Sequence, residues 1–96
     1  MSLHPQIAAL AAQLEDLSTF LRGQGDRLWS GRVDLCRHLV ADSNFAGVER
    51  FLRLFEGEES LDSVRLDDPR AIAEFDRLRN AARSLAQRLA KEEGAD

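Results

Sequence analysis

The regular spacing of apolar residues constrains the fold of this chain most strongly. Near the N-terminus apolar side chains recur at alternating intervals of four and three residues: Leu3, Ile7, Leu10, Leu14, Leu17 and Leu21. The same alternation returns near the C-terminus: Ala71, Phe75, Leu78, Ala82, Leu85 and Leu89. This spacing places an apolar stripe along one face of an α-helix, so each helix needs a partner that buries the stripe.

Helix start and stop signals divide the chain into four helical segments. Pro5 and Pro69 suit the first turn of a helix, Asp26 suits an N-cap, and Gly57 suits a left-handed residue after a helix end. The expected helices span about 5–22, 27–41, 45–56 and 69–92. Because the connections are short, we predict a single all-α domain over residues 1–96, an antiparallel four-helix bundle.

The second predicted helix carries the apolar stripe Trp29, Val33, Cys36 and Val40. Gly31 lies in the middle of this helix, where glycine costs up to about 1 kcal/mol relative to alanine. A close helix crossing at Gly31 would compensate for that cost. On this stripe Cys36 is expected to be a small buried hydrophobic residue rather than a nucleophile.

The stretch LFEGEESLDSVRL, residues 54–66, interrupts the helical pattern. Leu61, Val64 and Leu66 are apolar, and the remainder of 58–66 is polar. Three apolar anchors are more than a flexible linker would carry. We therefore expect an ordered loop or a short helical turn at 58–66.

Charge and composition exclude several classes of function. The net charge of −4 argues against sequence-independent nucleic-acid binding, which requires a surplus of cations. No apolar run approaches the roughly 20 residues that span a bilayer, and the first residues do not resemble a secretory signal. One cysteine permits no internal disulfide, which fits a cytoplasmic location. We therefore expect no nucleic-acid partner and no membrane partner.

One polar helix face could hold a metal ion or a catalytic base. Asp34, His38 and Asp42 recur every four residues and share one face of the second predicted helix. Further ligands on another helix would be needed, and the Glu and Glu-x-x-His spacing of di-metal bundles is missing from the sequence. Ordinary pairing on a solvated face explains the same residues. We predict no catalytic residue, no metal site and no cofactor, and hence a protein that is not an enzyme.

The densest negative charge lies between the third and fourth predicted helices. Capping and the helix dipole explain Asp67 and Asp68. No local structural task explains Glu58, Glu59 or Asp62, so the loop either is merely solvated or attracts a basic partner. The candidate partner-binding residues are Glu56, Glu58, Glu59, Asp62 and Arg65.

The same stretch resembles a family of small all-helical bacterial proteins of unknown function, whose pattern includes a helix ending LFGGMGSLNDLVL. The matching residues here are Trp29, Leu54, Phe55, Gly57, Ser60, Leu61, Asp62 and Leu66. Glu56, Glu58 and Glu59 depart from the pattern, replacing two glycines and a methionine with charge. The resemblance implies a long C-terminal helix, and it implies no known activity or cofactor.

These observations favour a protein–protein interaction module whose acidic loop binds a basic protein. By analogy with small bacterial proteins of this kind, an immunity-like protein or an adaptor is expected, and a basic toxin or nuclease would be a suitable partner. The alternative is a homodimeric structural or scaffold protein without a separate ligand, because the repeated apolar stripes could pair with a second copy.

Overall fold

The computed structural model describes residues 4–94, and this part of the chain is all-helical, as predicted. Its elements are α1 (Pro5–Gly23), α2 (Arg27–Ala41), α3 (Ala46–Arg53), the 3-10 helix η1 (Leu61–Ser63) and α4 (Pro69–Gly94). Within this range no helix combines the length and the apolar character needed to cross a membrane.

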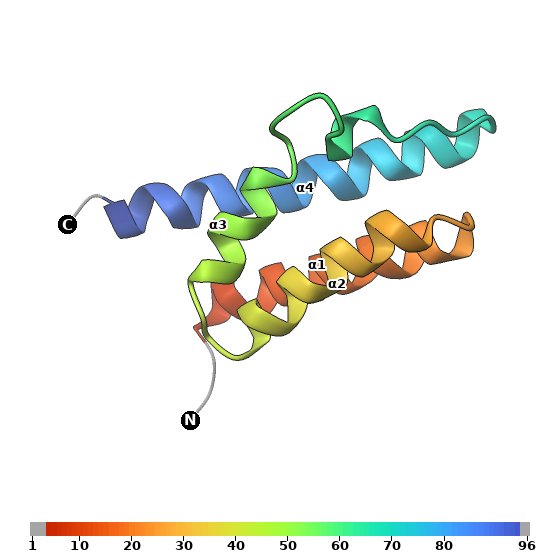
Figure 1. Ribbon diagram of the computed structural model, residues 1–96. Coiled ribbons are helices and arrows are strands. Elements are labelled where there is room, and N and C mark those ends of the chain that lie inside the picture. Colours follow the sequence, from red (N-terminus) through yellow and green to blue (C-terminus); the bar gives the residue numbers. More distant parts are fainter. Residues whose placement is uncertain (1–3, 95–96) are drawn as a thin grey trace.

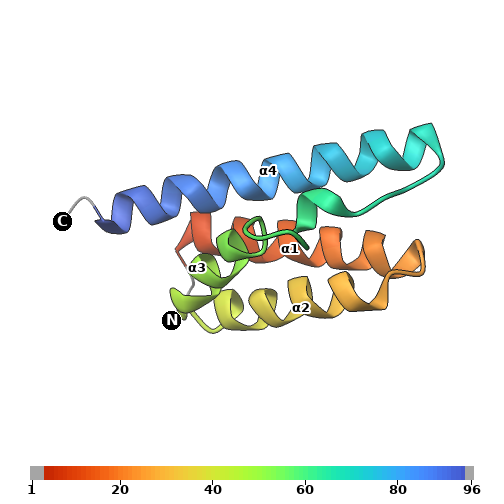
Figure 2. The same ribbon diagram turned by 45° about the horizontal axis from the view of Figure 1, so that its top comes forward.

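Residues 4–94 form three long α-helices, one short α-helix and the 3-10 helix η1. A tight turn joins α1 to α2, and the two helices pack side by side (Figure 1). On its other side α1 packs against α4, so that α1 lies between α2 and α4 (Figure 2). The short α3 crosses obliquely and contacts both α2 and α4. Together with the segment that follows it, α3 covers one side of the three long helices.

The predicted apolar stripes form the core. Leu10, Leu14, Leu17 and Leu21 of α1 are all 0% exposed. On α4 the buried members of the stripe are Ala71, Phe75, Ala82 and Leu89, and Leu78 and Leu85 are half-buried. Leu3, which we assigned to the first stripe, lies outside the described residues. The central position of α1 follows from this pattern, because its leucines meet apolar faces on both sides.

The helix boundaries follow the capping signals. Pro5 and Pro69 are the first residues of α1 and α4. The Asp26 carboxylate accepts a hydrogen bond from the Trp29 backbone N–H at 2.9 Å and so caps α2, which spans the predicted 27–41. A glycine with positive φ, Gly25 at +86°, allows the sharp reversal before Asp26.

The third helix is shorter than predicted. It spans Ala46–Arg53 rather than 45–56, and the chain tightens after it into turns in which each N–H bonds the carbonyl three residues back. Gly57 does adopt the expected left-handed conformation, with φ +86°. The helix therefore ends four residues before this glycine, because the chain leaves the helical path earlier to reach α4.

The prediction of a close helix crossing at Gly31 is wrong. A Cβ atom built at Gly31 would meet nothing within 4 Å. The close approach lies at Gly47 of α3, where a Cβ would be 2.8 Å from both the Leu39 Cβ and the Val40 backbone N of α2. The missing side chain at residue 47 lets α3 lie directly against α2.

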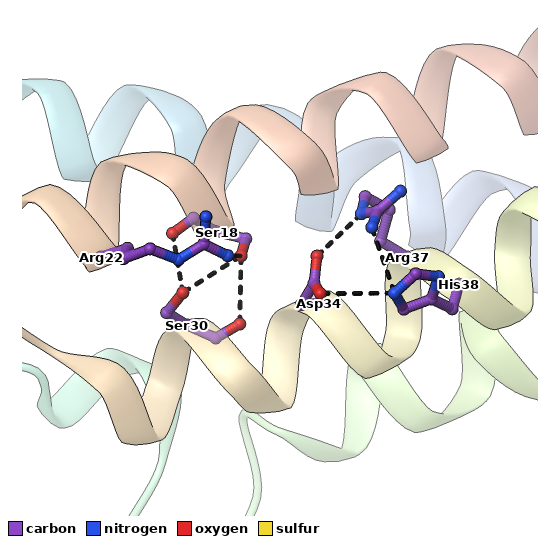
Figure 3. Close-up of polar contacts among 6 residues, drawn as sticks. All are labelled: Ser18, Arg22, Ser30, Asp34, Arg37 and His38. Atoms are coloured by element: carbon purple, nitrogen blue, oxygen red, sulfur yellow. Dashed lines mark hydrogen bonds and ion pairs between the residues drawn. The ribbon is translucent and has the colours of Figure 1, made fainter.

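Two buried serines join α1 and α2 near their connecting turn (Figure 3). The Ser18 hydroxyl donates to the Ser30 carbonyl at 3.1 Å, and the Ser30 hydroxyl donates to the Ser18 carbonyl at 3.0 Å. Both hydroxyls are therefore satisfied in a buried position, where an unpaired polar group would be costly. Small side chains at this crossing also let the two helix backbones come close.

Substitution of Gly47 by alanine tests the close approach of α3 to α2. The added methyl would overlap backbone and Cβ atoms of α2, so we expect a loss of about 1–3 kcal/mol in the free energy of unfolding. Gly31→Ala is the matched control, because open space surrounds that position and the helix gains up to about 1 kcal/mol. Urea denaturation measures both; equal effects of the two variants would contradict the packing described.

Candidate functional site: the acidic loop

The acidic loop, residues 54–68, is held in place by its apolar residues. Leu61 is 0% exposed, and Val64 and Leu66 are half-buried against the core. The Leu61 N–H donates to the Leu54 carbonyl at 2.7 Å and closes the loop. Ser60 and Ser63 form a capping box around η1. The predicted ordered segment with a short helical turn is thus present.

Three of the predicted partner-binding carboxylates face solvent. Glu56, Glu58 and Glu59 are exposed, and none of them forms an ion pair with another residue of the described range. They lie on the turns and bends that lead from α3 into Ser60. Arg65, which follows η1, is also exposed, again without an ion pair among residues 4–94. Glu56, Glu58 and Glu59 thus form a group of exposed carboxylates before η1, and Asp67 and Asp68 are exposed after it.

Asp62 differs from these three, because it is engaged within the molecule. Its carboxylate lies 3.4 Å from the Arg79 Nε and 3.7 Å from an Arg83 guanidinium nitrogen, both on α4. Asp62 is exposed like the other three, but its ion pairs give it a structural task that the sequence did not reveal, and its role in partner binding stays a prediction. Asp62 tethers the loop to α4 and presents less free charge to a partner.

Arg79 and Arg83 were not among the residues selected from the sequence. The Arg79 guanidinium lies 5.0 Å from the centre of the Phe75 ring, and the Arg83 guanidinium lies 4.5 Å from that of Phe55. Arg79 also pairs with Asp76 at 3.0 Å. Arg79 directly follows Leu78 of the apolar stripe, and Arg83 directly follows Ala82. Because the two arginines are four residues apart, they share a helix face, and this spacing could have indicated that both lie beside the core.

The polar face of α2 is an ion-paired cluster (Figure 3). The Asp34 carboxylate accepts a hydrogen bond from the Arg37 Nε at 2.8 Å and lies 3.4 Å from the His38 Nε2. The hydrogen bond from Arg37 lowers the pKa of Asp34. Asp42, the third residue of the proposed ligand set, is exposed. Among residues 4–94 no three acidic, histidine or cysteine side chains gather closely enough to hold a metal ion.

The two remaining candidates of α2 belong to the core. Cys36 is 0% exposed, and burial raises the pKa of its thiol from 9.0 to about 11. The thiol is therefore protonated at neutral pH and is a poor nucleophile. Trp29 is buried, with the Arg32 guanidinium 4.7 Å from the centre of its ring. Neither residue adds chemistry to the acidic loop, which can accept hydrogen bonds and attract cations.

Comparison of the chain with protein-family models, with curated proteins and with solved structures gives no match. The resemblance at residues 54–66 therefore stays a prediction that depends on the motif residues.

Two substitutions separate the contributions of burial and charge to loop order. Leu61→Ala removes a fully buried side chain, and we expect it to lower the free energy of unfolding by about 2–5 kcal/mol. Asp62→Asn removes a half-exposed ion pair, and we expect less than about 1 kcal/mol. Chemical denaturation of the two variants checks this order; a larger loss in Asp62→Asn would mean that charge, not burial, holds the loop.

Burial of Cys36 predicts a loss of stability at alkaline pH. The unfolded thiol loses its proton near pH 9.0, whereas the folded thiol keeps it up to about pH 11. The stabilising contribution is thus complete below pH 9 and is lost as pH rises to about 11, on the order of 1–3 kcal/mol. Urea titrations at several pH values should show a steeper decline in the wild type than in Cys36→Ala. Parallel declines would contradict the raised pKa.

Proposed function

We propose that this protein is a non-enzymatic interaction module that binds a basic protein through the acidic loop. The observation that carries the proposal is the contrast within the loop: Leu61 anchors it in the core, while Glu56, Glu58 and Glu59 stay exposed and unpaired among the described residues. An ordered loop loses little conformational entropy on binding, and its carboxylates accelerate encounter with cationic surfaces.

The role we propose within a cell is that of an immunity-like protein or an adaptor in the cytoplasm. A basic toxin or nuclease has the surface charge that three exposed carboxylates would complement. We propose that the four helices form an antiparallel bundle, in which the short α3 crosses obliquely and the acidic loop follows it. A single cysteine in a buried position suits a reducing compartment.

Neutralisation of the three free carboxylates tests the proposal. The variant Glu56→Gln, Glu58→Gln, Glu59→Gln should lose the partner that the wild type captures from its native host, and the captured protein should be basic. Association in the wild type should slow as salt concentration rises, because charge steering is screened. The fold should be unaffected, since these side chains are exposed.

The matched control removes negative charge elsewhere. Glu15→Gln with Asp16→Asn neutralises two exposed carboxylates of α1, outside the loop. Capture should persist in this control. Loss of the partner in both variants, or a partner that is not basic, would contradict a role for the loop.

A second candidate function is self-association into a structural homodimer. Leu28 and Leu35 of α2 are 57% and 45% exposed, and their spacing of seven residues puts them on one helix face. Light scattering over a range of concentrations separates the two candidates. A monomer at every concentration removes the homodimer, whereas a dimer that dissociates in Leu28→Gln, Leu35→Gln would replace the first proposal.

A further inference from the structure

We propose that the notch beside the α1–α2 turn binds a small organic anion through a carboxylate or phosphate group. Six residues line this notch, which has a volume of about 490 Å³: Arg22, Gly25, Arg27, Ser30, Gly31 and Asp34. A volume of several hundred cubic ångströms is in the range of small-molecule sites. The notch is separate from the acidic loop, so this inference does not depend on the proposed function.

Two arginines from different helices supply the positive charge of the notch. Arg22 is in the last turn of α1, and Arg27 is the first residue of α2. Both arginines are exposed, and neither forms an ion pair with another residue of the described range. The Arg22 guanidinium lies 3.5 Å from the Ser18 hydroxyl, which directs it toward the buried serine pair (Figure 3). Two guanidinium groups beside one cavity suit a carboxylate or a phosphate.

Asp34 offsets part of this charge, because Arg22 contributes, after the hydrogen bond from Arg37, to the lowered pKa of Asp34. Its carboxylate is hydrogen-bonded to Arg37 and close to His38, and Figure 3 shows these contacts on the side of Asp34 away from Arg22. The lining thus carries two guanidinium groups against one carboxylate.

Gly31 is the second observation that supports a binding site. Glycine weakens a helix interior, and close packing usually explains its presence there. No such packing exists at Gly31, since a Cβ at this position would meet nothing within 4 Å. What the missing side chain does provide is open space, because Gly31 forms part of the notch wall. A ligand that occupies this space would explain a glycine at residue 31, which helix packing does not explain.

Titration with anions tests the proposal on the whole chain. Inorganic phosphate and citrate are added at constant ionic strength, and backbone amide shifts are followed by NMR. We expect saturable shifts centred on Gly25, Ser30 and Gly31. Saturation by phosphate or by citrate identifies which anionic group the notch prefers, and either supports the proposal. Shifts that do not saturate, or that lie elsewhere, would overturn it.

Variants of the notch make the test specific. Arg22→Gln with Arg27→Gln should weaken binding at least tenfold, whereas Arg70→Gln with Arg88→Gln, two exposed arginines of α4, should leave it unchanged. Gly31→Gln fills the notch without adding charge, so it should block anion binding. Its unfolding midpoint in urea should be no lower than that of the wild type. Gly23→Ala changes a helical glycine outside the notch and should bind the anion as the wild type does. Wild-type affinity in Gly31→Gln, or equal losses in both arginine pairs, would contradict the site.

Discussion

Burial of the leucine stripe of α1 is the interaction on which the rest of the structure depends. Leu10, Leu14, Leu17 and Leu21 are completely buried because α1 lies between α2 and α4. Each fully buried leucine contributes about 1.5–3 kcal/mol, more than any polar contact described above. Since α2 and α4 pack on opposite sides of α1, the short α3 and the acidic loop are left to cover the remaining face. The position of the loop is thus a consequence of how α1 is buried.

The acidic loop combines local order with dense surface charge. Order comes from the buried Leu61, from the half-buried Val64 and Leu66, and from the hydrogen bond that closes the loop at Leu54. The ion pairs of Asp62 add orientation more than stability, because half-exposed pairs contribute little. Glu56, Glu58 and Glu59 take no part in holding the loop and are therefore free to act on a partner.

Periodicity and capping residues were sufficient to predict four helices and the bounds of α2. They could not predict contacts between elements far apart in sequence. The sequence pattern led us to expect a close helix approach at Gly31, but the close approach lies at Gly47. Residue spacing shows which residues share a helix face, but it does not show which helix packs against that face. Asp62 looked free for the same reason, since Arg79 and Arg83 come beside it only after α4 folds back. The choice of Glu56, Glu58 and Glu59 as partner-binding residues rests on local charge and stays a prediction.

Native-state hydrogen exchange of the Leu61 amide tests most directly whether the loop is a fixed part of the core. This N–H bonds the Leu54 carbonyl at 2.7 Å, in the interior of the segment that carries the free carboxylates. If burial holds the loop, the Leu61 amide exchanges only at the rate set by unfolding of the core, as the amides around Leu14 and Leu17 do. Exchange as fast as that of the exposed Glu58 amide would show that the loop opens independently, and the preformed acidic surface would not exist.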